Sequence, residues 1–109
     1  MINQHGRDAQ AKVTVYIDSD LAEIVPGFLE NRRRDIQSLQ TALQQNDLTA
    51  IRVLGHRMKG DGGGYGFDTI SEIGEALELA AAQQDRPTIE RRTSELHDFL
   101  TRLDVVYRK

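Results

Sequence analysis

Four stretches of this chain repeat apolar side chains every three or four residues, and short polar segments separate them. That spacing is typical of amphipathic helices. The apolar stripes consist of Phe28, Leu29, Ile36, Leu39 and Leu43; Leu48, Ile51, Leu54 and Met58; Ile70, Ile73, Leu77 and Ala81; and Ile89, Leu96, Phe99 or Leu100, Leu103, and Val106 or Tyr107. Four such helices joined by short turns predict an all-α fold, an antiparallel up-down four-helix bundle.

Two of the turns carry signals for the start of a helix. Thr69 with Glu72 three residues later has the spacing of a capping box. Asp85 is a candidate cap for the last helix, and Pro87 is tolerated in a first helical turn. These signals place the third and fourth helices on either side of the polar segment 83–87.

The chain before the first stripe has a different character. Residues 1–11 are polar and aperiodic, which predicts a mobile tail. Residues 12–17 (Lys-Val-Thr-Val-Tyr-Ile) favour a strand but are too isolated for a sheet, so we expect an extended lead-in lying on the helices. Asp18 or Ser19 can cap a first helix, and Pro26 then either follows a short helix or kinks a longer one. The expected division is a lead-in, 1–17, and a bundle domain, 18–109.

Composition narrows the class of protein. A chain of 109 residues suits one domain with a modest core, and a net charge of -3 argues against a dedicated nucleic-acid binder. There is no cysteine for a disulfide or a thiolate metal site, no apolar run of the ~20 residues that span a bilayer, and no apolar secretion signal. We therefore expect a cytoplasmic protein that does not enter a membrane.

The run from His56 to Gly66, His-Arg-Met-Lys-Gly-Asp-Gly-Gly-Gly-Tyr-Gly, is the most distinctive in the chain. On a helical wheel one face carries Ile51, Leu54 and Met58. The roughly opposite face carries Arg52, His56, Lys59, Gly60 and Gly63. A histidine that served only packing would lie on the apolar face, so His56 is predicted to face outward, either as a functional group or as an idle surface residue.

The glycines in this run favour the functional interpretation. Five of the seven residues from 60 to 66 are glycine, and each lowers helix propensity by up to ~1 kcal/mol relative to alanine. Such a sequence usually serves a close backbone approach or a special turn, although a flexible loop is an alternative. A phosphate-binding P-loop is excluded, because the lysine of a P-loop follows the glycines whereas Lys59 precedes them. A metal site is not indicated, since His5, His56 and His97 lack ligand spacing.

The run also resembles the signature of histidine-containing phosphotransfer (HPt) domains. His56, Lys59, Gly60 and Gly66 match that signature, and residues 18–107 follow the family's helix order and spacing. The segments 28–30 (Phe-Leu-Glu) and 42–47 (Ala-Leu-Gln-Gln-Asn-Asp) resemble its usual first-helix sequence. The resemblance implies a four-helix phosphoryl carrier without kinase activity of its own.

The resemblance also implies roles for individual residues. His56 would be the phosphoacceptor through Nε2, and Lys59 would hold the phosphoryl oxygens. Glu78, twenty-two residues after the histidine, would accept a hydrogen bond from Nδ1, unless it is a solvated surface carboxylate. The residues expected to let a partner dock are Arg52, Gly60, Gly63 and Gly64.

The implied partners are response-regulator receiver domains and a sensor histidine kinase. The phosphoryl group would come from a receiver aspartate or the kinase and pass to another receiver, and the divalent metal would be held by the receiver, not by this chain. A monomer is expected because the histidine face must stay free. The alternative is an adaptor that binds a receiver or another signalling protein without carrying phosphate; a hydrolase is not favoured, because no nucleophilic serine or cysteine lies beside His56.

Two charged features bear on these alternatives. Asp61 stands where the family usually has a small residue, and it could repel a phosphoryl group, pair with Lys59, cap the helix end, or point outward. The run Arg32-Arg33-Arg34 is interpreted as solvated helix surface, with a rim that attracts an acidic partner as the functional alternative.

Overall fold

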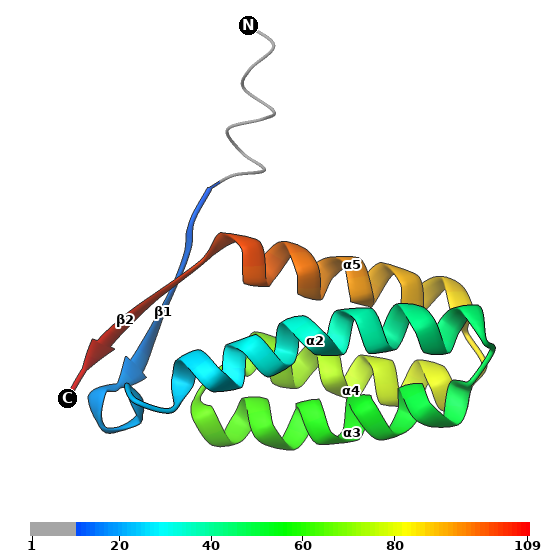
Figure 1. Cartoon of the computed structure of the whole chain (residues 1–109), viewed down its shortest axis with the longest axis horizontal. Helices are drawn as coiled ribbons and strands as arrows, with labels where there is room; N and C mark the ends of the chain where they lie inside the picture. The colour runs from blue at the N-terminus through cyan, green and yellow to red at the C-terminus, as the bar shows by residue number, and fades with distance from the viewer. Residues whose placement is uncertain (1–10) are drawn as a thin grey trace, which may run out of the picture.

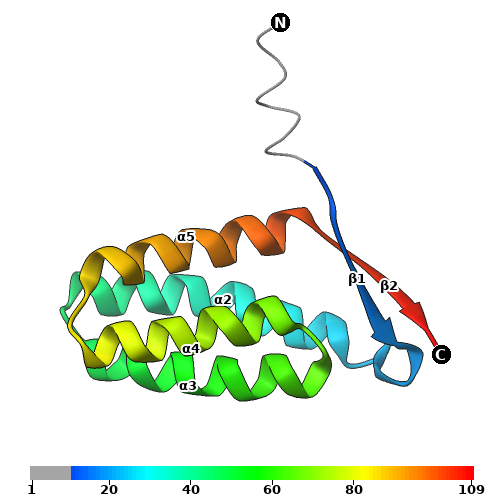
Figure 2. The ribbon, with the colours of Figure 1, turned by 180° about the vertical axis from the view of Figure 1, so that it is seen from behind.

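A computed structural model describes residues 11–109. In chain order it consists of strand β1 (Val13–Asp18), the 3-10 helix η1 (Ser19–Leu21), the α-helices α2 (Val25–Gln44), α3 (Leu48–Tyr65), α4 (Asp68–Ala82) and α5 (Arg86–Arg102), and strand β2 (Leu103–Arg108). The four α-helices run alternately up and down beside one another (Figures 1 and 2). The antiparallel four-helix bundle predicted from the sequence is confirmed. The predicted mobile tail, 1–11, lies outside the described residues except for Ala11.

The core is built from the predicted stripes, with every helix contributing. Leu39, Ile51, Leu77 and Leu96 are at most 1% exposed, one from each of α2 to α5. A small aromatic group closes the end where α3 turns into α4: the Phe28 ring lies 4.5 Å from that of Tyr65 and 5.5 Å from that of Phe67. With an aliphatic core and few aromatic residues, the bundle follows the pattern expected from burying one apolar stripe per helix.

The helix starts agree with the sequence signals at one end of the bundle and differ at the other. Asp85 caps α5, because its carboxylate accepts hydrogen bonds from the Thr88 hydroxyl (2.7 Å) and backbone N–H (3.2 Å), and these bonds lower the pKa of Asp85. The predicted capping box at Thr69 is wrong. Helix α4 already begins at Asp68, and its N-cap, Phe67, is a buried core residue that provides no side-chain cap.

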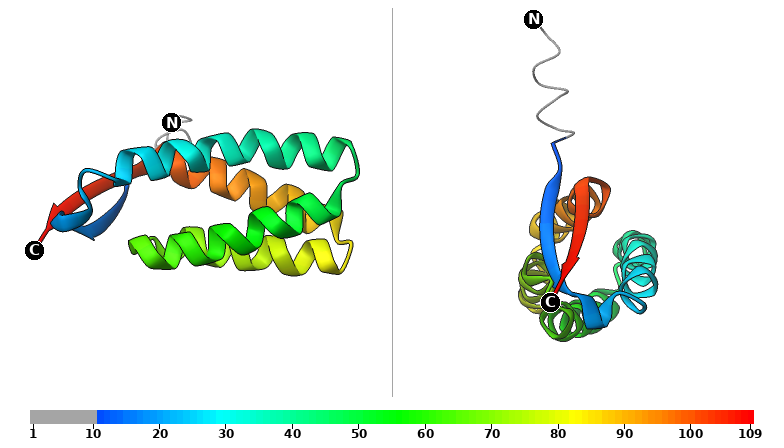
Figure 3. Two further views of the ribbon diagram at one scale, coloured as in Figure 1. Left: turned by 60° about the horizontal axis from the view of Figure 1, so that its bottom comes forward. Right: turned by 90° about the vertical axis from the view of Figure 1, so that its left-hand side faces the viewer.

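The strands correct two predictions. β1 and β2 form a two-stranded parallel sheet, with Val13 opposite Leu103 and Asp18 opposite Arg108 (Figure 3). Residues 12–17 are therefore not an isolated lead-in, and the last helix does not continue to Tyr107 but ends at Arg102. The apolar residues after 102 fit a helical stripe and a strand equally well, and the pairing partner lies about ninety residues away in sequence.

The segment between β1 and α2 resolves the alternatives left open at Pro26. The Asp18 carboxylate accepts a hydrogen bond from the Asp20 backbone N–H at 2.9 Å and caps η1, which is only three residues long. Pro26 then occupies the first turn of α2, where its missing N–H leaves no hydrogen bond unmade. The short helix before the proline is thus the correct alternative. None of the helices within 11–109 is long and apolar enough to cross a membrane.

The arginine run on α2 is not uniformly solvated. Arg32 is only 9% exposed: its Nε lies 2.8 Å from the Asp35 carboxylate, and its guanidinium lies 4.8 Å from the centre of the Phe28 ring. Burial raises the pKa of Asp35, and the charge of Arg32 opposes that shift. Arg33 and Arg34 are exposed as predicted, so the solvated interpretation is wrong for Arg32 alone.

Candidate functional site

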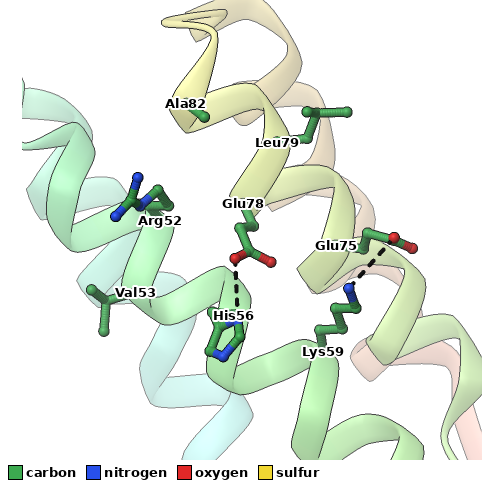
Figure 4. A pocket seen from close by; sticks show the side chains of 8 residues that line it. All are labelled: Arg52, Val53, His56, Lys59, Glu75, Glu78, Leu79 and Ala82. Atoms are coloured by element: carbon green, nitrogen blue, oxygen red, sulfur yellow. Dashed lines mark hydrogen bonds and ion pairs between the residues drawn. The ribbon is translucent and has the colours of Figure 1, made fainter.

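The outer face of α3 presents His56 beside α4. The imidazole is 72% exposed, while Ile51, Gly55 and Met58 on the opposite side of the helix are buried. Its Nδ1 lies 3.0 Å from Oε2 of Glu78, which projects from α4 (Figure 4). The prediction that His56 faces outward is confirmed, and the residue suggested as its partner lies within hydrogen-bond distance.

Lys59 forms a second link between the same two helices one turn further along. Its Nζ lies 3.6 Å from Oε2 of Glu75, and both side chains are largely exposed (Figure 4). An exposed pair at this distance contributes only ~0–1 kcal/mol and exchanges readily. The cation is therefore held near the imidazole without being locked in place.

Close contact of the α3 and α4 backbones sets these distances. A Cβ atom added at Gly55 would lie 2.7 Å from both the Glu78 amide nitrogen and the Gly74 carbonyl oxygen. One added at Gly74 would lie 2.5 Å from the Lys59 amide nitrogen. Only glycine permits this approach. It brings the α4 segment that carries Glu75 and Glu78 against the α3 segment that carries His56 and Lys59.

Gly55 and Gly74 were not among the functional residues predicted from the sequence. Their signal was a glycine inside the apolar stripe of each of two consecutive helices, one beside Leu54 and the other beside Ile73. Neither glycine reveals by itself that the other lies opposite. Gly62 makes a similar contact, since its added Cβ would lie 2.7 Å from the Ser71 amide nitrogen.

A shallow open depression of about 620 Å³ surrounds the histidine. Its lining consists of Arg52, Val53, His56, Lys59, Glu75, Glu78, Leu79 and Ala82. Val53 and Leu79 are 46% and 57% exposed, so the depression offers apolar surface beside its charged groups. Arg52 was predicted from the sequence to belong to this surface, but Val53, Glu75, Leu79 and Ala82 were not. For Val53 and Leu79, the available signal was an apolar residue outside the apolar stripe of its helix.

The other predicted docking residues lie next to this depression, not in it. Gly60, Gly63 and Gly64 are exposed on α3, and an added Cβ would meet nothing within 4 Å at Gly60 or Gly64 and only the Ser71 hydroxyl, at 3.7 Å, at Gly63. The flexible-loop alternative for this segment is wrong, because α3 continues to Tyr65. Gly66 ends it with φ of 88°, the left-handed conformation that favours glycine.

Asp61 points toward α2. Its Oδ2 lies 3.5 Å from Nη1 of Arg32, and Lys59 is paired with Glu75 instead. Asp61 lies five positions after His56, which places it well over a quarter of a circle away around the helix axis. The pairing of Asp61 with Lys59 that the sequence allowed does not occur. Among residues 11–109 there is also no group of three His, Asp or Glu side chains placed to hold a metal ion.

Comparison with known families supplies the assignment that this geometry suggests. Residues 23–105 match the family model of the Hpt domain. The chain belongs to the Hpt domain family. Hpt domains are phosphocarriers, not enzymes, and membership implies a part in phosphorelay by histidine phosphotransfer, with receiver domains and kinases as partners. Among curated proteins and among solved structures, no match was found.

Proposed function

We propose that His56 accepts a phosphoryl group from the phospho-aspartate of a receiver domain, or from a sensor kinase, and passes it to a second receiver. The observation that carries this proposal is the 3.0 Å contact between Nδ1 of His56 and Glu78 on an exposed face. With Nδ1–H donating to the carboxylate, the lone pair stays on Nε2 and faces solvent.

On this chain, only Nε2 of His56 forms or breaks a covalent bond during the transfer. Nε2 of neutral His56 attacks phosphorus in line, the N–P bond forms, and the bond from phosphorus to the aspartate oxygen breaks, releasing that carboxylate. The ring keeps its Nδ1 proton and becomes cationic, and the negative charge of Glu78 stabilises it. The reverse sequence returns the phosphoryl group to the next receiver.

Lys59 and the receiver both stabilise the negative charge on the phosphoryl oxygens. The ammonium group can exchange Glu75 for a phosphoryl oxygen, because their exposed pair is weak. The divalent metal belongs to the receiver, where it neutralises the oxygens of the reacting group. We therefore expect no cofactor on this chain and no transfer from ATP unless a kinase is added.

The surface around the histidine supports docking of a receiver. Val53 and Leu79 offer apolar contact in the depression, and Arg52 adds a positive charge at its margin. Beyond Lys59, the exposed glycines leave room for the loops of a partner. The adaptor alternative depended on interference by Asp61, and the orientation of Asp61 toward Arg32 supports the carrier over the adaptor.

The test is incubation with a receiver bearing labelled phospho-aspartate, and separately with phosphoramidate, followed by assay for acid-labile, alkali-stable label. The parent should be labelled, His56→Gln should carry none, and Lys59→Ala should be labelled more slowly. His97→Gln is the matched control, because His97 is an exposed histidine on α5 outside the depression. A parent that binds receivers yet takes no label from either donor would instead be an adaptor.

A further inference from the structure

The two-stranded sheet lies largely outside the part of the chain that defines the family. The match to the Hpt domain begins at residue 23, after β1, and ends at residue 105, within β2. The sheet sits at one end of the bundle, by the turn between α3 and α4 (Figure 3). Family membership therefore gives no account of it.

This sheet is incomplete by the usual standards of parallel sheets, which are covered on both faces and have more than two strands. Its inner face is packed, with Ile17 3% exposed. On its outer face the neighbours Tyr16 and Val106 are 55% and 38% exposed. Within residues 11–109, each strand pairs only with the other, so each has one edge without a partner strand.

The two edges differ in how well they are protected. β2 carries Asp104 and Arg108, and charges within an edge strand oppose pairing with another chain. β1 carries a charge only at its last residue, Asp18, and from Val13 to Ile17 it is Val-Thr-Val-Tyr-Ile, without proline or glycine and with strong β-propensity throughout. The β1 edge is thus the one open to a further strand.

The β1 sequence is complementary to itself when two copies run antiparallel around Val15. In that register Val13 lies opposite the partner's Ile17, and Thr14 lies opposite the partner's Tyr16. At each end Lys12 of one copy lies opposite Asp18 of the other, so the interface contains two pairs of opposite charge. We propose that two copies of this chain associate through β1 and form a four-stranded sheet in the order β2-β1-β1-β2.

The proposed interface is compatible with free histidine sites. His56 lies nine residues before Tyr65, about 13 Å along α3 from the end that carries the sheet. A monomer was expected because the histidine face must remain open. A dimer joined at the β1 edge satisfies the same requirement, with one exposed histidine on each copy.

Exchange of the terminal charges tests the register. Analytical ultracentrifugation of the full chain should show a dimer fraction that rises with concentration. Lys12→Glu and Asp18→Lys alone should each weaken association about tenfold, because each places like charges opposite one another twice. An equimolar mixture of the two variants should dimerise again, since every pair is then opposite in sign. Lys109→Glu and Asp20→Lys make the same charge changes outside the proposed contact and should leave association unchanged.

A single introduced cysteine tests the same register independently, because the chain contains no cysteine of its own. Only Val15 faces its own copy, so Val15→Cys should form an interchain disulfide under mild oxidation. Thr14→Cys and Tyr16→Cys, each opposite the other residue, should crosslink far less. A parent that stays monomeric at high concentration, or a dimer indifferent to the charge exchange and to the cysteine position, would overturn the proposal. Dimerisation of His56→Gln should equal that of the parent, so this result is independent of phosphotransfer.

Discussion

Helix α3 carries glycines of two kinds, which differ in what surrounds them. Gly55 and Gly62, with Gly74 on α4, are buried, and a Cβ added to any of them would come within 2.7 Å of backbone in the neighbouring helix. We call these the packed glycines. At Gly60 and Gly64, the open glycines, an added Cβ would meet no atom within 4 Å.

The difference separates two uses of the same residue. The packed glycines allow α3 and α4 to touch along their backbones, and this contact places Glu78 within reach of His56. The open glycines are not required for close packing between helices in the described chain, and each lowers helix propensity by up to ~1 kcal/mol. Their value must lie outside the fold, which agrees with docking of a partner beside the histidine.

The largest expected effect comes from filling a packed position. Gly74→Ala should destabilise the fold by about 1–3 kcal/mol, because the new methyl group overlaps the α3 backbone and the gain in helix propensity offsets only part of that strain. Moving the helices apart should also lengthen the contact between His56 and Glu78. Urea unfolding measures the first effect, and the ¹⁵N shifts of the imidazole, which report the tautomer, measure the second.

Gly62→Ala is the matched control for this experiment. It creates a comparable overlap with α4, at the Ser71 amide, but six residues or about 9 Å further along α3 from His56. It should cost similar stability and leave the imidazole tautomer unchanged. Equal tautomer changes in both variants would mean that the helix contact acts only on general stability.

A smaller effect of opposite sign is expected at the open positions. Gly60→Ala should raise the free energy of unfolding by up to ~1 kcal/mol, since the methyl group meets no neighbour and helix propensity improves. The same variant should slow phosphotransfer from a receiver while labelling by phosphoramidate stays as in the parent. If transfer from the receiver is also unchanged, the open glycines do not face the docked partner.

The contrast between the two kinds of glycine also marks how far the sequence could be interpreted. The open glycines, His56 and Lys59 were identified because their anomaly is local: polar or helix-breaking residues on one side of a single helix. Gly55 and Gly74 were missed because their meaning depends on a pairing between helices that no single stretch of sequence displays. The same limit applies to β2, whose strand conformation depends on a partner about ninety residues away.

The orientation of individual side chains was the second feature that could not be predicted from the sequence. The four stripes predicted the bundle, and the spacing of Asp85 and Pro87 predicted the start of α5. The sequence left four orientations for Asp61, and placed Arg32 in solvent. The error at Arg32 and the ambiguity at Asp61 both arise at the contact between α2 and α3. There the buried Arg32 guanidinium pairs with a carboxylate from each helix, Asp35 of α2 and Asp61 of α3.

The smallest expected effect concerns Asp61, which lies between the open Gly60 and the packed Gly62. Its distance of 3.5 Å from the Arg32 guanidinium and its half-exposed side chain correspond to a weak pair, so Asp61→Asn should change the free energy of unfolding by less than about 1 kcal/mol. The charge of Asp61 is one of the smaller causes that raise the pKa of Asp35. Its removal should therefore lower that pKa slightly, an effect that NMR titration of the Asp35 carboxyl would detect. Since Asp61 faces α2 and not the imidazole, labelling of His56 should proceed at the parental rate. A marked acceleration would show that the charge of Asp61 reaches the phosphoryl group. Asp61 would then belong to the surface of α3 that faces the docked receiver and not to the contact with α2.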